Sequence, residues 1–101
     1  MLRPSMSTFR VYAVLLRAAK VAAIEYARRG IRVNAVLPGL VNTAMLSGAT
    51  EEMLQAARSM HPIGRIAEPD EIAAAALFLL SDAASFVTGS AMSVDGGYVA
   101  V

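Results

Sequence analysis

The segment "IRVNAVL", residues 31–37, most constrains how this chain can fold. Its branched side chains are typical of a strand, and its nearly unbroken apolar character fits a parallel strand covered on both faces better than an exposed edge. Pro38 and Gly39 follow directly and are expected to end the strand in a turn. A fold built around this strand therefore needs protein on both of its faces.

A helix is predicted before this strand, from about Ser7 to Arg29. Apolar residues recur there at steps of three and four, while Arg and Lys residues fall on another face. The apolar stripe consists of Val11, Leu15, Ala18, Ala22 and Tyr26. Gly30 suits the C-terminal cap of this helix, because a left-handed backbone costs glycine little.

Two further helices and a second strand are predicted after the turn. Thr50 fits the N-cap of a short helix, with acidic residues in its first turn. Pro69 fits the first position of a helix that ends near Leu80. The part from Ile72 to Leu80 is apolar all round, so we expect it to be covered on more than one side. The last strand is predicted from about Ala91 to Val94.

The order helix, strand, helix, helix, strand indicates an α/β fold. Two strands make a poor sheet, because they leave edges and faces bare. With 56% apolar and only 17% charged residues, the chain has much apolar surface to cover. We predict a single unit over residues 1–101, with two strands, two long helices and one short helix, that forms only part of a larger sheet.

Composition excludes several kinds of site. The chain has no cysteine, which rules out a disulfide framework and a thiolate metal site, and one histidine cannot by itself form a metal centre. We therefore predict no metal. No apolar run reaches the roughly 18 residues that a membrane span needs, so no membrane partner is expected. The absence of cysteine permits a reducing cytoplasm, which is the location that we predict.

Charge is distributed unevenly, with seven of the nine basic residues in residues 1–32. Nucleic-acid binding is one interpretation, but no aromatic residues interleave with the basic ones and no groove-reading motif is present. We predict a solvated helix face and no nucleic-acid partner. The first 24 residues lack acids and contain Arg and Ser, which is also the composition of an organelle transit peptide, and this alternative stays open.

Two longer motifs occur in a characteristic order and spacing, "EYARRGIRVNAVLPGLVNTAM" and "HPIGRIAEPDEIAAAALFLLSDAASFVTGSAMSVDGG". Together they resemble the C-terminal portion of a short-chain dehydrogenase/reductase (SDR), over residues 22–97. The resemblance implies the C-terminal part of a Rossmann-like doubly wound parallel sheet, incomplete as a domain. Residues 1–19 diverge from the family pattern, and a shifted reading frame or a wrongly chosen start would explain this.

In that family the Pro-Gly turn lies against the nicotinamide end of NAD or NADP. The resemblance implies that Pro38, Gly39 and Val41 make backbone contacts with the cofactor and that Thr43 offers its hydroxyl to the carboxamide. The structural alternative is a strand-ending turn in which Thr43 acts as a cap or is solvated. The stretch 44–62 matches the family's mobile flap over the substrate.

The family's other functional parts are not found in this sequence. It has no phosphate-binding glycine loop, on which the pyrophosphate would lie. The positions of the family's catalytic Tyr-x-x-x-Lys fall on Thr8 and Tyr12. Lys20 lies eight residues beyond Tyr12, about 12 Å along a helix, and this is too far for a Tyr-Lys contact. We therefore predict no catalytic residue and assign Tyr12 to the apolar side of the helix.

The remaining polar residues have mainly structural interpretations. His61, within the flap stretch, is conceivable as a general base only with an oriented partner, which the sequence does not supply. Arg65 and Glu68 flank the start of the third helix and are expected to pair. Asp95 is predicted to form a turn through its own side chain.

Two functions remain open from the sequence. The first is that of an NAD(P)-dependent oxidoreductase fragment, which transfers hydride to or from a small alcohol or carbonyl substrate. The second is that of a catalytically inactive chain that associates through its apolar surfaces, either with itself as a homo-oligomer or with intact relatives. The missing glycine loop and Tyr-Lys pair discriminate between them.

Overall fold

The computed structural model describes residues 6–100, and their side chains from residue 15 onward. Its elements are helix α1 (Met6–Tyr26), strand β1 (Ala35–Pro38), helix α2 (Glu51–Met60), helix α3 (Pro69–Leu80) and strand β2 (Ala91–Val94). The predicted element order is confirmed. The side chains of Thr8 and Tyr12, at the positions of the family's Tyr and Lys, lie outside the described ones. Two compact units form, one from residues 36–77 and 93–100 and one from residues 6–35 and 78–92.

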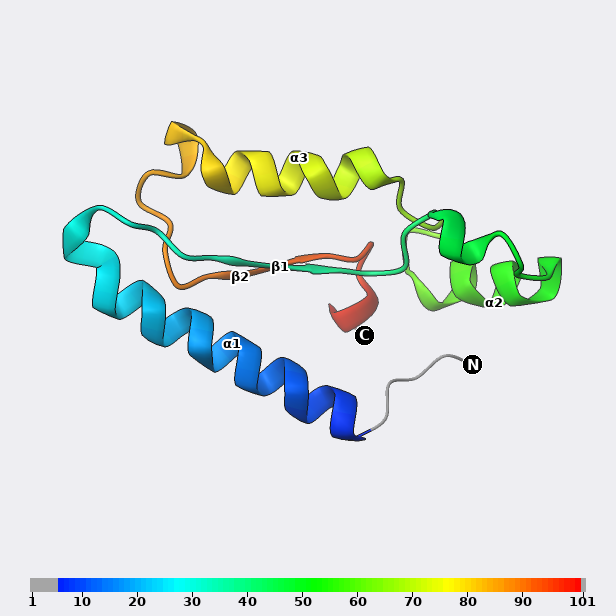
Figure 1. Ribbon diagram of the computed structural model, residues 1–101. Coiled ribbons are helices and arrows are strands. Elements are labelled where there is room, and N and C mark those ends of the chain that lie inside the picture. Colours follow the sequence, from blue (N-terminus) through cyan, green and yellow to red (C-terminus); the bar gives the residue numbers. More distant parts are fainter. Residues whose placement is uncertain (1–5, 101) are drawn as a thin grey trace. The chain divides into compact units, whose positions relative to one another are not determined.

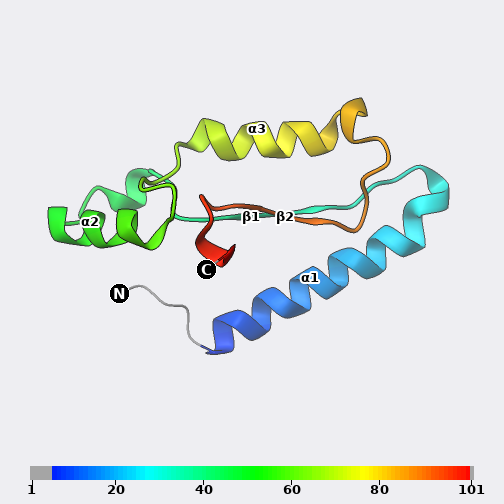
Figure 2. The same cartoon turned by 180° about the vertical axis from the view of Figure 1, so that it is seen from behind.

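Strands β1 and β2 form a two-stranded sheet (Figure 1). The Ala35 amide donates to the carbonyl of Ser90, and the Gly39 amide donates to that of Val94. Residue numbers rise together along both strands, so the sheet is parallel, as predicted. Figure 2 shows the same pairing from behind. Within the described residues each strand has one edge without a partner strand, and so small a sheet is not stable by itself.

Strand β1 begins at Ala35, four residues later than the predicted start at Ile31. Beside the backbone bond at Val33, the side chain of Asn34 bonds to the loop before β2. Its Nδ2 donates to the carbonyl of Val87 at 2.9 Å, and its Oδ1 accepts from the amide of Ser90 at 3.0 Å. The segment ahead of β1 is thus joined to the loop before β2 partly through side chains, although the amide of Gly89 also donates to the carbonyl of Val33 at 2.8 Å. We had expected regular strand pairing there.

The Arg32 side chain holds the chain that follows α3. Its Nη1 donates to the carbonyls of Leu79, at 2.7 Å, and Val87, at 3.2 Å, and its Nη2 donates to that of Ser81 at 3.3 Å. Leu79 belongs to the last turn of α3, where backbone carbonyls have no partner within the helix. A cation at this place also complements the negative end of the helix dipole.

We expect Arg32→Ala to lower the free energy of unfolding by about 2 kcal/mol, because three carbonyls lose a charged donor. Chemical denaturation followed by circular dichroism measures this loss. The exposed Arg28 offers a matched control, since Arg28→Ala is expected to change stability by less than about 0.5 kcal/mol. Equal losses in the two variants would contradict the role given to Arg32.

Local signals set the helix ends. The Thr50 hydroxyl accepts from the amide of Met53 at 3.2 Å, which confirms Thr50 as the N-cap of α2. Helix α1 passes into a 3₁₀ turn at Ala27–Arg29, and Gly30 then adopts a left-handed backbone with a φ of 77°. The bounds of α3 and β2 agree with the predicted ones.

The apolar residues that the described chain buries are few and mostly small. They are Ala57 in the first unit and Ala23, Leu79 and Ala84 in the second. In the described part of the predicted stripe of α1, Leu15 is 59% exposed and Tyr26 is also exposed. Ala23, outside that stripe, is buried and lies next to Gly89. The cover expected on more than one side of α3 is likewise missing here, because Leu77 and Leu80 are exposed.

Candidate functional site

The four predicted cofactor residues lie on one stretch that continues from the carboxyl end of β1. Pro38 is the last residue of the strand, and Gly39 follows it. Val41 forms an isolated parallel bridge with Ala67, and Thr43 precedes a 3₁₀ turn. The carboxyl ends of parallel strands are where α/β sheets commonly bind ligands. The strand thus carries the stretch to a position that is suitable for a binding site.

Sheet pairing decides which backbone groups of the turn are engaged. The Gly39 amide donates to the carbonyl of Val94 at 3.1 Å, so it is used within the sheet. Neighbouring residues of a strand point their polar groups to opposite edges. The carbonyl of Pro38 therefore points to the edge of β1 that has no partner strand among the described residues.

Val41 has its backbone groups turned outward. The amides of Asn42 and Ala67 donate to the carbonyls of Ala67 and Leu40, at 2.8 and 3.0 Å. These two bonds flank Val41, so its own amide and carbonyl point away from Ala67. Of the backbone amides in residues 38–43, those of Gly39, Leu40 and Asn42 donate within the chain, so the outward amide of Val41 is available to donate to a ligand.

The Thr43 side chain is exposed and does not act as a cap. Its backbone is extended, with φ −127° and ψ 174°, and the hydroxyl makes no cap hydrogen bond to the 3₁₀ turn that follows. The turn is closed through the backbone instead, because the amide of Leu46 donates to the carbonyl of Thr43. The capping alternative is thereby excluded, and the hydroxyl faces solvent.

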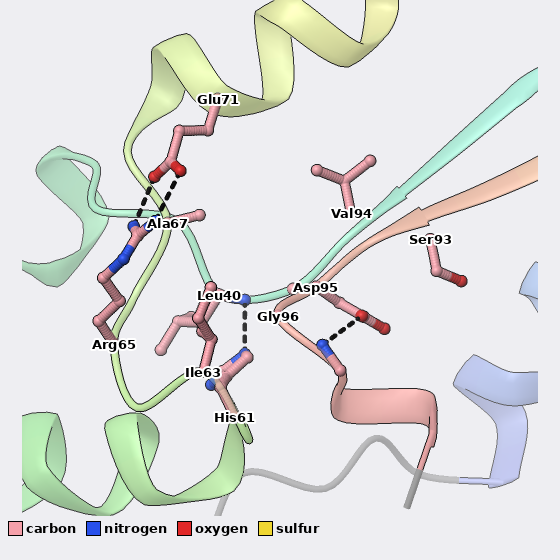
Figure 3. A pocket seen from close by; sticks show the side chains of 12 residues that line it. Leu40, His61, Ile63, Arg65, Ala67, Glu71, Ser93, Val94, Asp95 and Gly96 are labelled. Atoms are coloured by element: carbon pink, nitrogen blue, oxygen red, sulfur yellow. Dashed lines mark hydrogen bonds and ion pairs between the residues drawn. The ribbon is translucent and has the colours of Figure 1, made fainter.

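A cavity of about 260 Å³ lies in the first unit, beside this stretch (Figure 3). Of the four predicted residues, only Gly39 lines it. The titratable side chains in its wall are His61, Arg65, Glu71 and Asp95. Within residues 6–100, no three His, Cys, Asp or Glu side chains gather as a metal ion would require.

His61 is a buried side chain with both ring nitrogens engaged. It is 6% exposed, and its Nδ1 lies 2.7 Å from the carbonyl oxygen of Ala57. Its Nε2 accepts from the amide of Leu40 at 3.3 Å, and its ring packs against Tyr98 with centroids 5.6 Å apart. A general base needs a free nitrogen, so this geometry does not support that role. Sequence reasoning missed these contacts, because Leu40 and His61 are 21 residues apart.

Gly39 is required by contacts inside the chain itself. A Cβ at this position would lie 2.8 Å from His61 Nε2 and 3.0 Å from the Cα of Asp95. Real Cβ atoms essentially never show the first of these distances, and the second is tighter than most Cβ contacts. Sequence reasoning related this glycine to a bound ring, whereas the structure gives a reason within the protein.

Asp95 forms a turn, as predicted. Its Oδ1 accepts from the amide of Gly97 at 3.0 Å, and its Oδ2 accepts from the amide of Val99 at 3.2 Å. Both carboxylate oxygens are thus used in closing the chain after β2. The side chain has a structural role at this end of the cavity.

Arg65 pairs with Glu71, so its predicted pairing with Glu68 is wrong. Two bonds join the guanidinium and the carboxylate, Nη1 to Oε1 at 2.6 Å and Nη2 to Oε2 at 2.8 Å. Glu71 stands in the first turn of α3, from where its carboxylate also accepts from the amide of Glu68 at 3.0 Å. The Glu68 side chain accepts instead from Nδ2 of Asn42. The hydrogen bond from Arg65, followed by that from the Glu68 amide, lowers the pKa of Glu71 to about 2.

Because of this ion pair, we expect the folded chain to lose stability in acid. Because the folded pKa of Glu71 lies near 2, below its ordinary 4.5, its contribution is complete above pH 4.5 and is lost as the pH falls towards 2. Thermal unfolding measured from pH 7 to pH 2 should show this loss, and Glu71→Gln should remove it while Glu52→Gln should not. An unchanged acid profile in Glu71→Gln would refute the assignment.

Comparison with known proteins finds related sequences over most of the chain. A family model described as enoyl-(acyl carrier protein) reductase matches residues 10–99. A 2,5-dichloro-2,5-cyclohexadiene-1,4-diol dehydrogenase of Sphingobium indicum is 53% identical over 85 residues, which cover 81% of this chain and 34% of that protein. A cis-4-hydroxycyclohexanecarboxylate dehydrogenase of Sinomonas cyclohexanicum is 51% identical over 80 residues, which cover 79% and 32%. The chain spans about a third of the length of these relatives.

Solved structures show the same architecture. A short chain dehydrogenase family protein from Francisella tularensis subsp. tularensis SCHU S4 superposes with a TM-score of 0.86 at 34% identity, over 100% of this chain and 47% of that one. A 3-oxoacyl-[acyl-carrier protein] reductase from Brucella melitensis ATCC 23457 gives a TM-score of 0.81 at 37% identity, over 85% and 32%. The predicted fold class, an α/β arrangement that matches part of a Rossmann-like sheet, is thereby confirmed.

Proposed function

The chain belongs to the short-chain dehydrogenase/reductase family, and from this premise we propose that residues 38–43 bind the nicotinamide end of NAD or NADP. The reaction served would be hydride transfer between this cofactor and a small alcohol or carbonyl substrate. The observation that carries the proposal is the pair of unengaged groups at Val41 and Thr43. A carboxamide has one acceptor and one donor, and it suits an outward amide beside an exposed hydroxyl.

We assign a different role to each of the four residues. The Val41 amide would donate to the carboxamide oxygen, and the Thr43 hydroxyl would accept from its NH₂ group. The Pro38 carbonyl, at the unpaired edge of β1, would contact the ring, while Gly39 lets the turn pass close to His61 and Asp95. NAD and NADP stay equally open, because the acid or Arg that distinguishes them in related folds has no counterpart in this sequence.

The substrate proposed is a small molecule with an apolar body. Both curated relatives described above carry names of hydroxylated six-membered rings. Met45 and Met53, in the stretch that matches the family's flap, are exposed and offer adaptable apolar contact. We place the action of the protein in the cytoplasm, which its lack of cysteine permits.

The test is a titration of the isotope-labelled chain with NADH, followed by amide resonances. We expect binding in the millimolar range, about −4 kcal/mol, with shifts at Val41 and Thr43, because no glycine loop is present to hold the pyrophosphate. No alcohol oxidation is expected. Thr43→Val should weaken binding about fivefold, which corresponds to one hydrogen bond of about 1 kcal/mol. Ser47→Ala changes a nearby exposed hydroxyl and serves as the control. An absence of NADH-induced shifts at residues 38–43 would contradict the proposal.

A second function is favoured by the exposed apolar side chains of both units. The largest exposures belong to Phe86, Met45, Ile24 and Leu80, at 101, 92, 79 and 78%. Soluble monomers rarely leave such surface uncovered in contiguous patches. This chain would then be catalytically inactive and would associate with copies of itself or with intact relatives.

A further inference from the structure

We propose that His61 is a positioning residue that fixes the cofactor-contacting turn to the end of helix α2, and that it does so as the neutral tautomer with its hydrogen on Nδ1. This inference rests on the proposed function only for its consequence at the cofactor. The link itself stands on contacts between described residues. Figure 3 shows the His61 ring next to the turn, with its bond to Leu40 dashed.

The tautomer follows from the chemistry of the two partners. A backbone amide such as that of Leu40 can only donate, so Nε2 must present a lone pair to it. A carbonyl oxygen such as that of Ala57 can only accept, so Nδ1, at 2.7 Å, must carry the hydrogen. The reverse tautomer would place two donors together at one end of the ring and two acceptors at the other.

The ring connects two elements that are distant in sequence. His61 directly follows α2, and Ala57 lies in the last turn of that helix, where carbonyls lack partners within the helix. The other end of the ring reaches the turn after β1. One side chain thus completes the hydrogen bonding of a helix end and holds the peptide between Gly39 and Leu40 in place.

The surroundings of the ring leave it little freedom. Its Nε2 lies 2.8 Å from the position that a Cβ on Gly39 would take, and Tyr98 packs against it at a tilt of 38°. The charged groups in the same cavity wall are engaged elsewhere, Asp95 with backbone amides and Arg65 with Glu71. The ring is therefore buried and held on several sides.

The consequence reaches the cofactor through the next residue along the chain. The Leu40 amide fixes the orientation of its peptide, and Val41, with its outward amide, follows directly. His61 does not contact the cofactor in this arrangement. It orients the donor that does, and it makes the turn move together with α2, which belongs to the stretch that matches the family's substrate flap.

The first experiment measures the tautomer in the full chain. His61 is the single histidine, so its ring nitrogens need no assignment in long-range proton–nitrogen spectra. We expect a protonated Nδ1 and an unprotonated Nε2 at pH 7.5. Free histidine in water favours the opposite tautomer, with its hydrogen on Nε2. A protonated Nε2 would therefore overturn the proposal, whether the chain is folded or unfolded.

Two variants then test the hydrogen bonds at the two ring nitrogens one at a time. His61→Gln places an amide oxygen near the position of Nε2 and can still accept from Leu40, whereas His61→Asn places an amide nitrogen near Nδ1 and can still donate to Ala57. We expect His61→Asn to speed hydrogen exchange of the Leu40 amide at least tenfold and to abolish the NADH-induced shift at Val41. In His61→Gln both should stay within about twofold of the unsubstituted chain.

Equal behaviour of the two variants would overturn the link, because each loses one hydrogen bond and a purely structural role would not distinguish them. If NADH shifts no resonance even in the unsubstituted chain, the proposed cofactor role fails. The tautomer and the exchange of Leu40 would still decide whether His61 holds the turn.

Discussion

Gly39→Ala is expected to lower the free energy of unfolding by about 3 kcal/mol, at the upper end of what overpacking costs. The added methyl group would meet His61 Nε2 at 2.8 Å and the Cα of Asp95 at 3.0 Å, and the second of these belongs to the backbone. Relief would require the end of β1 to move away from the turn after β2. Urea denaturation, with the order of the turn followed by amide resonances, measures the effect.

Gly48 is the matched control for this substitution. A Cβ there would have no atom within 4 Å, and its backbone is not left-handed. Gly48→Ala should therefore be neutral or stabilise the chain by about 0.5 kcal/mol, since alanine restricts the unfolded chain. Comparable losses for Gly39→Ala and Gly48→Ala would disprove the close approach at Gly39.

The purified chain is expected to self-associate, with a weight-average mass at least twice that of the monomer at about 100 µM. In the second unit, Leu80 and Phe86 are 78% and 101% exposed, and apolar surface of this kind is removed from water by association. The double variant Leu80→Lys with Phe86→Lys should lower the mass towards that of the monomer. Light scattering over a concentration series measures the change.

A control for charge uses the exposed Ser85. Ser85→Lys adds a cation close to Phe86 but removes no apolar surface, so the association should persist. If the unsubstituted chain is a monodisperse monomer at all concentrations, the proposal that it associates through its apolar surface is wrong. If Ser85→Lys disperses the chain as well as the double variant does, charge rather than apolar contact governs the association.

The sequence was sufficient to predict helix ends where neighbouring residues determine them. Thr50 caps α2 and Pro69 begins α3 because the residues at a helix start satisfy nearby groups or preset their own backbone. Gly30 ends the first helix for a similar reason. The start of α2 and the bounds of α3 and β2 could therefore be predicted closely.

Contacts between distant residues could not be predicted in this way. Nothing near Arg32 indicates that its guanidinium meets carbonyls 47 to 55 residues away. Glu71 takes the place of Glu68 as the partner of Arg65 because of where the first turn of α3 directs its carboxylate. Such choices depend on tertiary geometry, which no short motif records.

The candidate site was predictable only through resemblance. Pro38, Gly39, Val41 and Thr43 carry no distinctive chemistry as residue types, and a turn of this composition occurs in many proteins. The bridge at Ala67 turns the amide of Val41 outward, and the proposed binding role depends on this orientation. The bond between His61 and Leu40 likewise appears only in three dimensions.

The connection between the two strands also governs the order in which the chain can fold. Ala35 pairs with Ser90, 55 residues further along, so the sheet can form only after a long loop has closed, at an entropic cost that grows with loop length. Helices α2 and α3 lie within that loop and need only short-range contacts. They should form early and shorten the loop that has to close. The turn at residues 38–43 then acquires its geometry late, when β1 meets β2.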